Sequence, residues 1–243
     1  MPDSREELVH RLFQGTVNTY DFMVNFGTFG CDKAWKRKIL NKVPSNSSKV
    51  LDLACGTGIV TFAIAKKLPD CQVIGVDMTE EYLDVARAKA KRLNVTNVEF
   101  IHQRAEEVSF NEPFDCVTAS YLAKYADLKT LIQNAKGMLK ENGLLILHDF
   151  TYPSNPLVAS LWGFYFKLLQ TLGSRIYPQW RAIFYELPQV VRGSTWLPDL
   201  IACLKQSGFT QITVERLIVS AAALVTARNG RSTGPGPVKS LQG

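Results

Sequence analysis

The sequence predicts an α/β fold built on a mostly parallel sheet with helices on both faces. Short runs of β-forming residues alternate with helical stretches through the middle of the chain, as in sheets of this kind. One apolar run enters a Gly-x-Gly turn at Gly56 and Gly58, where the absence of Cβ atoms lets the backbone approach a ligand closely. A second apolar run ends in Asp77, nineteen residues after Gly58. Together these features predict a Rossmann-like sheet of seven strands.

Five strands are expected to form the parallel part of the sheet, and two more are expected to follow near the end of the chain as an antiparallel addition. Their predicted ranges are 49–54, 73–77, 98–102, 114–119, 143–149, 210–217 and 219–227. Helices are expected where apolar residues recur at helical spacing. The clearest are 79–93, 127–139 and 197–207. The pair Asn142 and Gly143 is predicted to end the helix at 127–139.

Two segments lie outside this alternation. Residues 1–45 are predicted to be helical, with apolar residues such as Leu8 and Leu12 on one face, and residues 151–196 are rich in aromatic residues. Because the ligand lies beyond the carboxyl ends of the strands in open α/β sheets, both segments are placed to form a lid. We therefore expect a single domain over 1–228, containing an N-terminal helical lid and a lid insertion, and a disordered tail over 229–243.

The composition fits one globular domain. The chain has 243 residues, of which 46% are hydrophobic, which is enough to bury one core. Its first residues lack the apolar stretch of a signal peptide, and no run of eighteen apolar residues is present. The five cysteines are odd in number and have no C-x-x-C spacing, so we expect reduced thiols, a cytoplasmic protein and no metal site.

The net charge of +6 comes from the last part of the chain. Residues 151–243 contain nine Lys or Arg and three Asp or Glu, whereas residues 1–150 contain nineteen of each kind. This asymmetry suggests an anionic partner near one end of the molecule, and the alternative is a solvated basic surface.

The glycine-rich turn and Asp77 predict a site for a ligand that contains adenosine, because a carboxylate at the end of the second strand can bind the hydroxyls of a ribose. A dinucleotide motif would have a third small residue where Thr61 stands, and the Gly-Lys-Ser/Thr of a P-loop is absent from the sequence. The run 52–58 is instead similar to the first motif of S-adenosylmethionine-dependent methyltransferases. The alternative is an ordinary turn between a strand and a helix that binds nothing.

Further motifs narrow this similarity. They lie at residues 12–13, 19–25, 29–30, 35–37, 50–58, 75–79, 105–106, 114–117 and 149–150. In these motifs, and over residues 10–228, the chain resembles the ubiquinone/menaquinone biosynthesis C-methyltransferase family. The stretch 19–25 resembles that family's Tyr-Asp-x-Met-Asn lid signature in altered form and is moderately specific. The other motifs occur in many methyltransferases.

The resemblance implies S-adenosylmethionine as the cofactor. Its methionine part is expected at the backbone of the first turn, its ribose at Asp77, its adenine beside Met78, and its methyl end near Ser120, with Tyr20 closing over the sulfonium. Tyr20 is otherwise expected to be a tyrosine of the lid core. The implied cofactor-binding residues are Tyr20, Asp52, Ala54, Gly56, Gly58, Asp77, Met78, Ala105, Glu106 and Ser120.

The chain departs from the family's pattern in several places. Cys55 and Ile59 stand where the family has Gly and Asp, and Arg104 replaces an Asn or Asp that would accept a hydrogen bond from the adenine amino group. Lys124 and Tyr125 stand where the family has an Arg-Asn pair, so the charge is kept but the planar guanidinium is lost. These departures concern the substrate more than the cofactor.

Methylation of a quinol at carbon requires an electron-rich ring, which deprotonation of a phenolic hydroxyl supplies. Asp149, His148 and Lys124 follow strand ends and are the candidate catalytic residues. A neutral imidazole titrates in the useful range, and a carboxylate can act through a water molecule. The alternative for His148 is a structural histidine that contacts a neighbouring helix.

The resemblance also implies the substrate, a prenylated quinol of the menaquinone or ubiquinone type or its precursor. The apolar run 157–172 is too short to span a membrane but suits a membrane surface, and Arg175, Arg181 and Arg192 are placed to meet anionic headgroups. We therefore expect a protein that is cytoplasmic or peripheral at the inner face of the membrane.

Two other functions stay open. The first is O-, N- or C-methylation of another small aromatic compound or natural product, under a lid that encloses a water-soluble substrate. The second is a non-catalytic nucleotide-binding protein. A nucleic-acid partner is not expected, because the sequence lacks the Asp/Asn-Pro-Pro-aromatic run of nucleic-acid methylation after its fourth strand.

Overall fold

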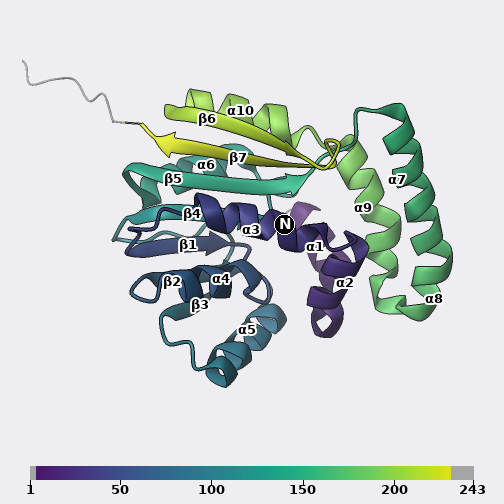
Figure 1. The fold of residues 1–243 in the computed structure, drawn as a ribbon, viewed down its shortest axis with the longest axis horizontal. Helices are drawn as coiled ribbons and strands as arrows, with labels where there is room; N and C mark the ends of the chain where they lie inside the picture. Colours follow the sequence, from purple (N-terminus) through teal and green to yellow (C-terminus); the bar gives the residue numbers. More distant parts are fainter. Residues whose placement is uncertain (1–3, 231–243) are drawn as a thin grey trace, which may run out of the picture.

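Seven strands form one sheet, in the order β3-β2-β1-β4-β5-β7-β6, in the computed structural model, which describes residues 4–230 (Figure 1). β1 to β5 are parallel, and β7 runs antiparallel between β5 and β6. The strands are β1 (Lys49–Leu53), β2 (Gln72–Asp77), β3 (Val98–His102), β4 (Phe114–Ser120), β5 (Leu139–Phe150), β6 (Phe209–Leu217) and β7 (Ala222–Asn229). The predicted sheet is therefore confirmed.

Helices cover both faces of this sheet. They are α3 (Cys31–Lys42), α4 (Ile59–Lys67), α5 (Glu80–Leu93), α6 (Leu128–Met138) and α10 (Trp196–Gln206). Residues of α3 and α4 share a core with one face, and residues of α6 and α10 share a core with the other. α5 packs beside β2 and β3.

Side chains of β1 alternate between the two cores, as the pleat of a strand requires. Val50 lies in the core beneath α3 and α4, and Leu51 lies in the core beneath α6 and α10. The alternation turns Asp52 toward α4, where its carboxylate accepts a hydrogen bond from the Thr61 hydroxyl at 2.7 Å. A polar side chain is thus held inside the sheet by a partner on the covering helix.

The strand order fixes where a ligand can enter. From β1 the chain builds outward to β2 and β3, and it then crosses to β4 on the other side of β1. Connections that leave β1 and β4 in opposite directions open a crevice beyond the carboxyl ends of these two strands. The functional edge of the sheet is therefore the one at which β1 and β4 end.

Most of the two segments predicted to form a lid lies beyond this edge, to the right of the sheet in Figure 1, whereas α3, inside the predicted lid 1–45, covers a face of the sheet instead. Their elements are α1 (Ser4–Phe13), η1 (Val17–Thr19), α2 (Tyr20–Gly27), α7 (Pro156–Leu168), η2 (Leu169–Gly173), α8 (Ser174–Ile176), η3 (Pro178–Trp180) and α9 (Arg181–Gly193). A third core joins both segments, because Leu12 and Met23 pack with Trp180 and Phe184.

Hydrogen bonds also connect the two lid segments. The Trp180 Nε1 donates to the Thr19 hydroxyl at 2.8 Å, and the Tyr165 hydroxyl donates to the Gly27 carbonyl at 3.0 Å. Within residues 4–230, no helix has the length and hydrophobicity needed to cross a membrane.

One predicted helix boundary is wrong. α6 ends at Met138, and the pair Asn142 and Gly143 lies inside β5 rather than at the end of the helix. Asn142 adopts a positive φ of 61°, next to a register shift in the pairing of β5 with β4. The pair therefore marks an irregularity in a strand, which sequence alone does not distinguish from a helix end.

The predicted start of the tail is also wrong. Asn229 is the last residue of β7, and its side-chain nitrogen lies within 3.3 Å of the carbonyl oxygens of Lys136, Leu139 and Lys140. This residue therefore fastens the end of the sheet to the segment between α6 and β5. The rest of the predicted tail, residues 231–243, lies outside the described residues.

Candidate active site

A cavity lies at the carboxyl ends of β1, β2 and β4, beneath the N-terminal helices. It brings together eight of the ten residues predicted to bind the cofactor. These are Tyr20, Ala54, Gly56, Asp77, Met78, Ala105, Glu106 and Ser120. A smaller adjoining cavity shares Tyr20, Ala54, Gly56 and Ser120 with it and adds Asp52.

The turn after β1 takes its shape from residues with positive φ. Ala54, Gly56 and Gly58 have φ values of 52°, 54° and 82°. At Gly58 a Cβ atom would lie 2.7 Å from the Phe62 ring, so any side chain would force a rearrangement. Gly58 is the N-cap residue directly before α4 but does not line the cavities described here, so its predicted contact with the cofactor stays a prediction.

Asp77 joins the turns after β1 and β2. Its carboxylate accepts hydrogen bonds from the backbone N–H of Gly56 at 2.8 Å and of Thr79 at 2.9 Å. Burial raises the pKa of Asp77, and these two hydrogen bonds oppose that rise. A carboxylate has about four acceptor positions, so acceptor capacity remains on the side that lines the cavity. Two neighbouring hydroxyls, as on a ribose, fit this arrangement.

Asp52 lies deeper, behind the turn. Its carboxylate accepts hydrogen bonds from the hydroxyls of Thr61 at 2.7 Å and Thr118 at 2.8 Å. Burial raises its pKa from 3.8 to about 6, although both hydroxyls oppose the rise. Asp52 therefore contributes a buried negative charge at neutral pH to the smaller cavity.

Lys36 is a residue of this site that sequence reasoning missed. It lines the smaller cavity, where its Nζ donates to the Asp32 carboxylate at 2.8 Å. The Tyr121 hydroxyl donates to the other oxygen of Asp32 at 2.7 Å. Lys36 belongs to the run 35–37, one of the motifs that resemble the family, but no role was predicted for it. That run is the signal that could have revealed it.

The opposite end of the larger cavity is lined by Met78, Ala105 and Glu106. Arg104 also lines this end and forms an ion pair with Glu6 of α1 at 2.6 Å. Arg104 therefore fastens the N-terminal helix over the cavity, at the position where the family has an Asn or Asp.

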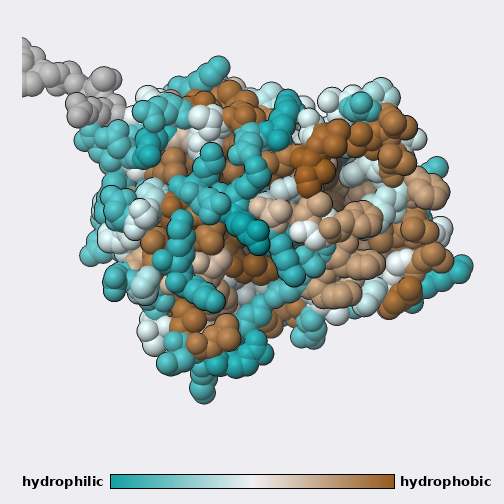
Figure 2. Space-filling model, viewed as in Figure 1, coloured by the Kyte–Doolittle hydropathy of each residue, from teal (hydrophilic) through white to brown (hydrophobic). Residues whose placement is uncertain are grey.

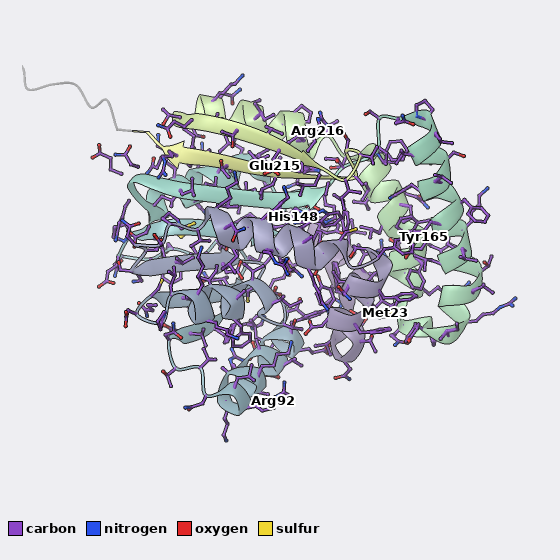
Figure 3. The ribbon with its side chains drawn as sticks, in the orientation of Figure 1. Met23, Arg92, His148, Tyr165, Glu215 and Arg216 are labelled. Atoms are coloured by element: carbon purple, nitrogen blue, oxygen red, sulfur yellow. The ribbon has the colours of Figure 1, made fainter. Side chains whose placement is uncertain are left out.

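A second hollow lies between the sheet edge and the lid segments and is the larger of the two, about 240 Å³ against about 100 Å³. Its walls are mainly apolar or aromatic and include Met23, Phe150, Trp162, Phe166, Leu169 and Ile183. Met23 of α2 and Tyr165 of α7 both line the space between the N-terminal helices and the insertion (Figure 3). Four residues line both cavities, namely Phe13, Tyr20, Tyr121 and Tyr125.

The three candidate catalytic residues have different environments. Lys124 lines the apolar hollow, whereas Asp149 and His148 line none of the cavities described here. Asp149 is fully buried and accepts hydrogen bonds from the Lys124 Nζ at 2.7 Å, the Lys124 N–H at 3.1 Å and the Phe150 N–H at 2.7 Å. In this geometry Asp149 positions Lys124, and its predicted role as a base acting through a water molecule stays a prediction.

His148 is enclosed by aromatic residues. Its ring packs against Trp35 and Tyr121, and its Nδ1 lies 2.9 Å from the Ser120 hydroxyl. Burial lowers the pKa of His148 to about 3, so the imidazole is neutral at pH 7. The contact with Trp35 of α3 is the one that the structural alternative expects, but the His148 Nε2 has no hydrogen-bond partner within the described part of the chain, so the catalytic role stays a prediction. Among the described residues, no three His, Cys, Asp or Glu side chains are grouped to hold a metal ion.

Comparison with known families identifies the chain. The profile of the ubiE/COQ5 methyltransferase family matches residues 1–228. The chain belongs to this family. The fold, the methyltransferase activity and S-adenosylmethionine as the methyl donor agree with the expectations drawn from the sequence motifs.

Individual relatives agree with the family assignment. A demethylmenaquinone methyltransferase of Staphylococcus aureus (strain JH9) is 26% identical over 225 residues, which cover 91% of this chain and 92% of that protein. Among solved structures, Haemonchus contortus phosphoethanolamine N-methyltransferase 2 with S-adenosyl-L-methionine has a TM-score of 0.69 and 16% identity, and the match covers 94% of this chain and 60% of that one. The N-methyltransferase NodS of Bradyrhizobium japonicum has a TM-score of 0.55 and 16% identity over 82% of this chain and 97% of that one. The two structures show a shared fold.

Because its pKa is raised, Asp52 is predicted to make the folding stability of this member of the ubiE/COQ5 family depend on pH. The pKa of the Asp52 carboxyl is about 6 in the folded state and 3.8 in the unfolded state. The folded state therefore binds this proton more tightly, so Asp52 stabilises the fold at low pH, and this stabilisation is lost as the pH rises through 6. Relative to Asp52→Asn, the wild type should therefore lose about 3 kcal/mol of unfolding free energy between pH 3.5 and pH 7.5. Urea unfolding at a series of pH values measures this difference, and a difference that does not change with pH would contradict the buried charge.

Proposed function

We propose that this methyltransferase transfers a methyl group to a ring carbon of a prenylated quinol of the menaquinone type. The observation that carries the proposal is the apolar hollow that adjoins the cofactor cavity. At its outer end the hollow is lined by exposed residues, including Phe29 and Ile218, so it reaches the surface. A ring at the inner end with an apolar chain along the hollow matches this shape and polarity.

The name of the Staphylococcus aureus relative supports the same substrate class, because that protein is a demethylmenaquinone methyltransferase. The polar groups at the inner end of the hollow, which include Lys124 and Tyr125, differ from the family's Arg-Asn pair. A different phenolic headgroup is therefore the second candidate, and the assay below includes it.

In the proposed complex the residues at the sheet edge hold S-adenosylmethionine in an extended pose. Asp77 accepts hydrogen bonds from the ribose hydroxyls, while Met78, Ala105 and Glu106 surround the adenine. The turn at Ala54 and the smaller cavity take the methionine part, in which the Lys36 ammonium attracts the carboxylate and buried Asp52 attracts the amino group. In this assignment, each charged group of the methionine part lies beside a side chain of opposite charge.

When bound, S-adenosylmethionine supplies a methyl group that joins the electron pair of the ring carbon, while sulfur keeps the pair of the broken bond and the ring proton leaves to solvent. The protein aligns the two partners and excludes water. Tyr20 lines both cavities and packs edge-on against Tyr82 and face-on against Trp180. A rigid aromatic group at this junction shields a sulfonium from water and attracts its positive charge.

A first prediction concerns the ribose contact. Asp77→Ala removes the acceptor and should weaken S-adenosylmethionine binding at least tenfold, because hydrogen bonds to a charged group contribute about 1.5–3 kcal/mol each. Calorimetry with S-adenosylmethionine measures the affinity, and thermal unfolding without ligand reports any structural damage. The control is Glu81→Gln, an exposed acid on α5 that does not line the cavity. Equal affinities for Asp77→Ala and wild type would contradict the ribose contact.

A second prediction concerns the acceptor. Purified protein with labelled S-adenosylmethionine should methylate a demethylmenaquinol at carbon, and prenylated acceptors should have kcat/KM values at least tenfold above a prenyl-free naphthoquinol, because the chain buries apolar surface in the hollow. Mass spectrometry and NMR identify the methylated atom. Transfer only to oxygen or nitrogen, or a preference for prenyl-free phenols, would support the second candidate instead.

Lid residues around the mouth of the hollow suggest a membrane surface as the source of the substrate. α7 has no fully buried residue, and its exposed side chains at helical spacing form an apolar stripe that continues into η2 and α8. The stripe consists of Leu157, Leu161, Phe164, Leu168, Leu172 and Ile176. Figure 2 shows hydrophobic residues along the side formed by α7 and α8. Exposed apolar stripes of this extent are typical of contact surfaces.

Charge near the stripe fits an anionic bilayer. Lys167 and Arg175 are exposed within the same helical segment, and Arg181 and Arg192 lie over the rings of Tyr185 and Tyr152. Basic residues beside an apolar helix face are typical of proteins that bind anionic lipid surfaces. We therefore propose peripheral contact with a membrane through this stripe.

Vesicle flotation tests the membrane contact. The wild type should float with vesicles that contain anionic lipid, and Leu161→Glu/Phe164→Glu should reduce the bound fraction at least tenfold, because two apolar side chains no longer enter the bilayer. The control is Leu93→Glu, an equally exposed apolar residue on α5, away from α7 in Figure 1. Flotation that is the same for all three proteins, or absent in the wild type, would favour a water-soluble substrate.

A further inference from the structure

The reacting ends of donor and acceptor must meet where the two cavities share their walls. Three of the four shared residues are tyrosines, so each brings a hydroxyl to residues that line both cavities. The Tyr121 hydroxyl is occupied, because it donates to Asp32 at 2.7 Å. The Tyr125 hydroxyl makes no such hydrogen bond within residues 4–230.

Tyr125 presents an unpaired hydroxyl in a buried position. The residue is 7% exposed, its ring packs edge-on against Phe13, and its hydroxyl has no hydrogen-bond partner among the described residues. An unpaired buried polar group costs about 1–3 kcal/mol. Burial raises the pKa of Tyr125 well above its usual range, with a smaller contribution from the charge of Asp149, so the hydroxyl keeps its proton and can donate it in a hydrogen bond.

The preceding residue brings a cation to the same place. The Lys124 Nζ lies 4.3 Å from the centroid of the Tyr125 ring, and its side chain is only 2% exposed. It donates to Asp149 at 2.7 Å and to the Tyr121 carbonyl at 3.0 Å. An ammonium has three donors, so one remains for a ligand. Lys124 and Tyr125 therefore offer two hydrogen-bond donors to the inner end of the hollow.

We propose that Lys124 and Tyr125 together bind one oxygen of the acceptor as an oxyanion, namely a phenolate next to the ring carbon that receives the methyl group. This inference rests on the proposed function and defines the acceptor as one that ionises at a ring hydroxyl. The phenolic proton is released to solvent on binding, so no side chain needs to act as a base on the acceptor. Asp149 is then a positioning residue that fixes the direction of the Lys124 ammonium.

The charges of the pocket are consistent with this role. Lys124 and Asp149 neutralise each other, so the bound phenolate adds one negative charge opposite the sulfonium of the cofactor. A hollow with mainly apolar walls strengthens that attraction, because the effective dielectric is low. Burial lowers the pKa of Lys124, and the charge and hydrogen bond of Asp149 oppose that lowering. The ion pair at 2.7 Å therefore favours the ammonium form.

An unsubstituted naphthol tests the oxyanion site without methyl transfer, because its neutral and anionic forms differ in absorption and fluorescence. Like phenols generally, whose pKa is about 10, it is neutral in water at pH 7. With S-adenosylhomocysteine bound, the wild type should bind the anion at pH 7, which requires the proton affinity of the bound naphthol to fall about a thousandfold. Tyr125→Phe, which keeps the ring, should lose most of this effect, and Tyr152→Phe, which lies outside the hollow, should retain it.

Each outcome decides the inference. Binding of neutral naphthol only, or a naphthol pKa in Tyr125→Phe that equals that in the wild type, would overturn it. So would a shift of the naphthol pKa that is lost in Tyr20→Phe but kept in Tyr125→Phe.

A quinol that is methylated gives a second measurement. In Tyr125→Phe the increase of kcat with pH should move to higher pH, whereas damage to folding alone would not move it. If naphtholate binds but no quinol is methylated, the oxyanion site stands and the proposed acceptor fails. If a quinol is methylated with the same pH profile in Tyr125→Phe, the acceptor stands and the oxyanion site fails.

Discussion

The carboxylate of Asp77 connects the turn after β1 to the turn after β2, and the cofactor cavity depends on that connection. It bonds the backbone of Gly56 and Thr79, so the first two strands end at a fixed distance from each other. Two backbone donors use part of the carboxylate and leave the rest for a ligand. The same group therefore shapes the cavity and, in the proposed complex, also binds the ribose.

Ala54 and Tyr121 extend this constraint to the neighbouring strand. Each follows directly after β1 or β4 and has a positive φ, 52° and 66°, which costs a residue with a Cβ atom about 1–3 kcal/mol. The strain lets the chain turn sharply at the point where the strands end, so that both residues line the cavities rather than the core. Such strain is tolerated because the parallel strands on either side are buried on both faces.

Sequence reasoning predicted the sheet well because it depends on local signals. Apolar runs and the spacing from Gly58 to Asp77 are properties of short stretches, and they predicted most of the strand-end residues that line the cavity. The contacts that complete the site are not local. Trp180 donates to Thr19, which lies 161 positions earlier, and Lys36 is recognised as part of the site only once α3 is packed over β1. The environment of Asp149 was also hidden, because a strand-end acid has the same sequence pattern whether it faces a ligand or a buried lysine.

The lid segments are attached to the domain with unequal strength. The N-terminal helices and α9 share the third core, whereas α7 closes the hollow without a single fully buried residue. Swinging α7 outward would break the Tyr165 hydrogen bond to Gly27, the ring contact of Tyr165 with Phe29 and the packing of α7 against α9, but no fully buried side chain of α7 would be exposed. The hydrocarbon tail of the proposed acceptor would therefore not need to be threaded through a narrow opening, because the wall beside it contributes no side chain to the buried cores. For the same reason, substitutions along α7 would alter the fit of the proposed acceptor's tail without disturbing the folding of the sheet.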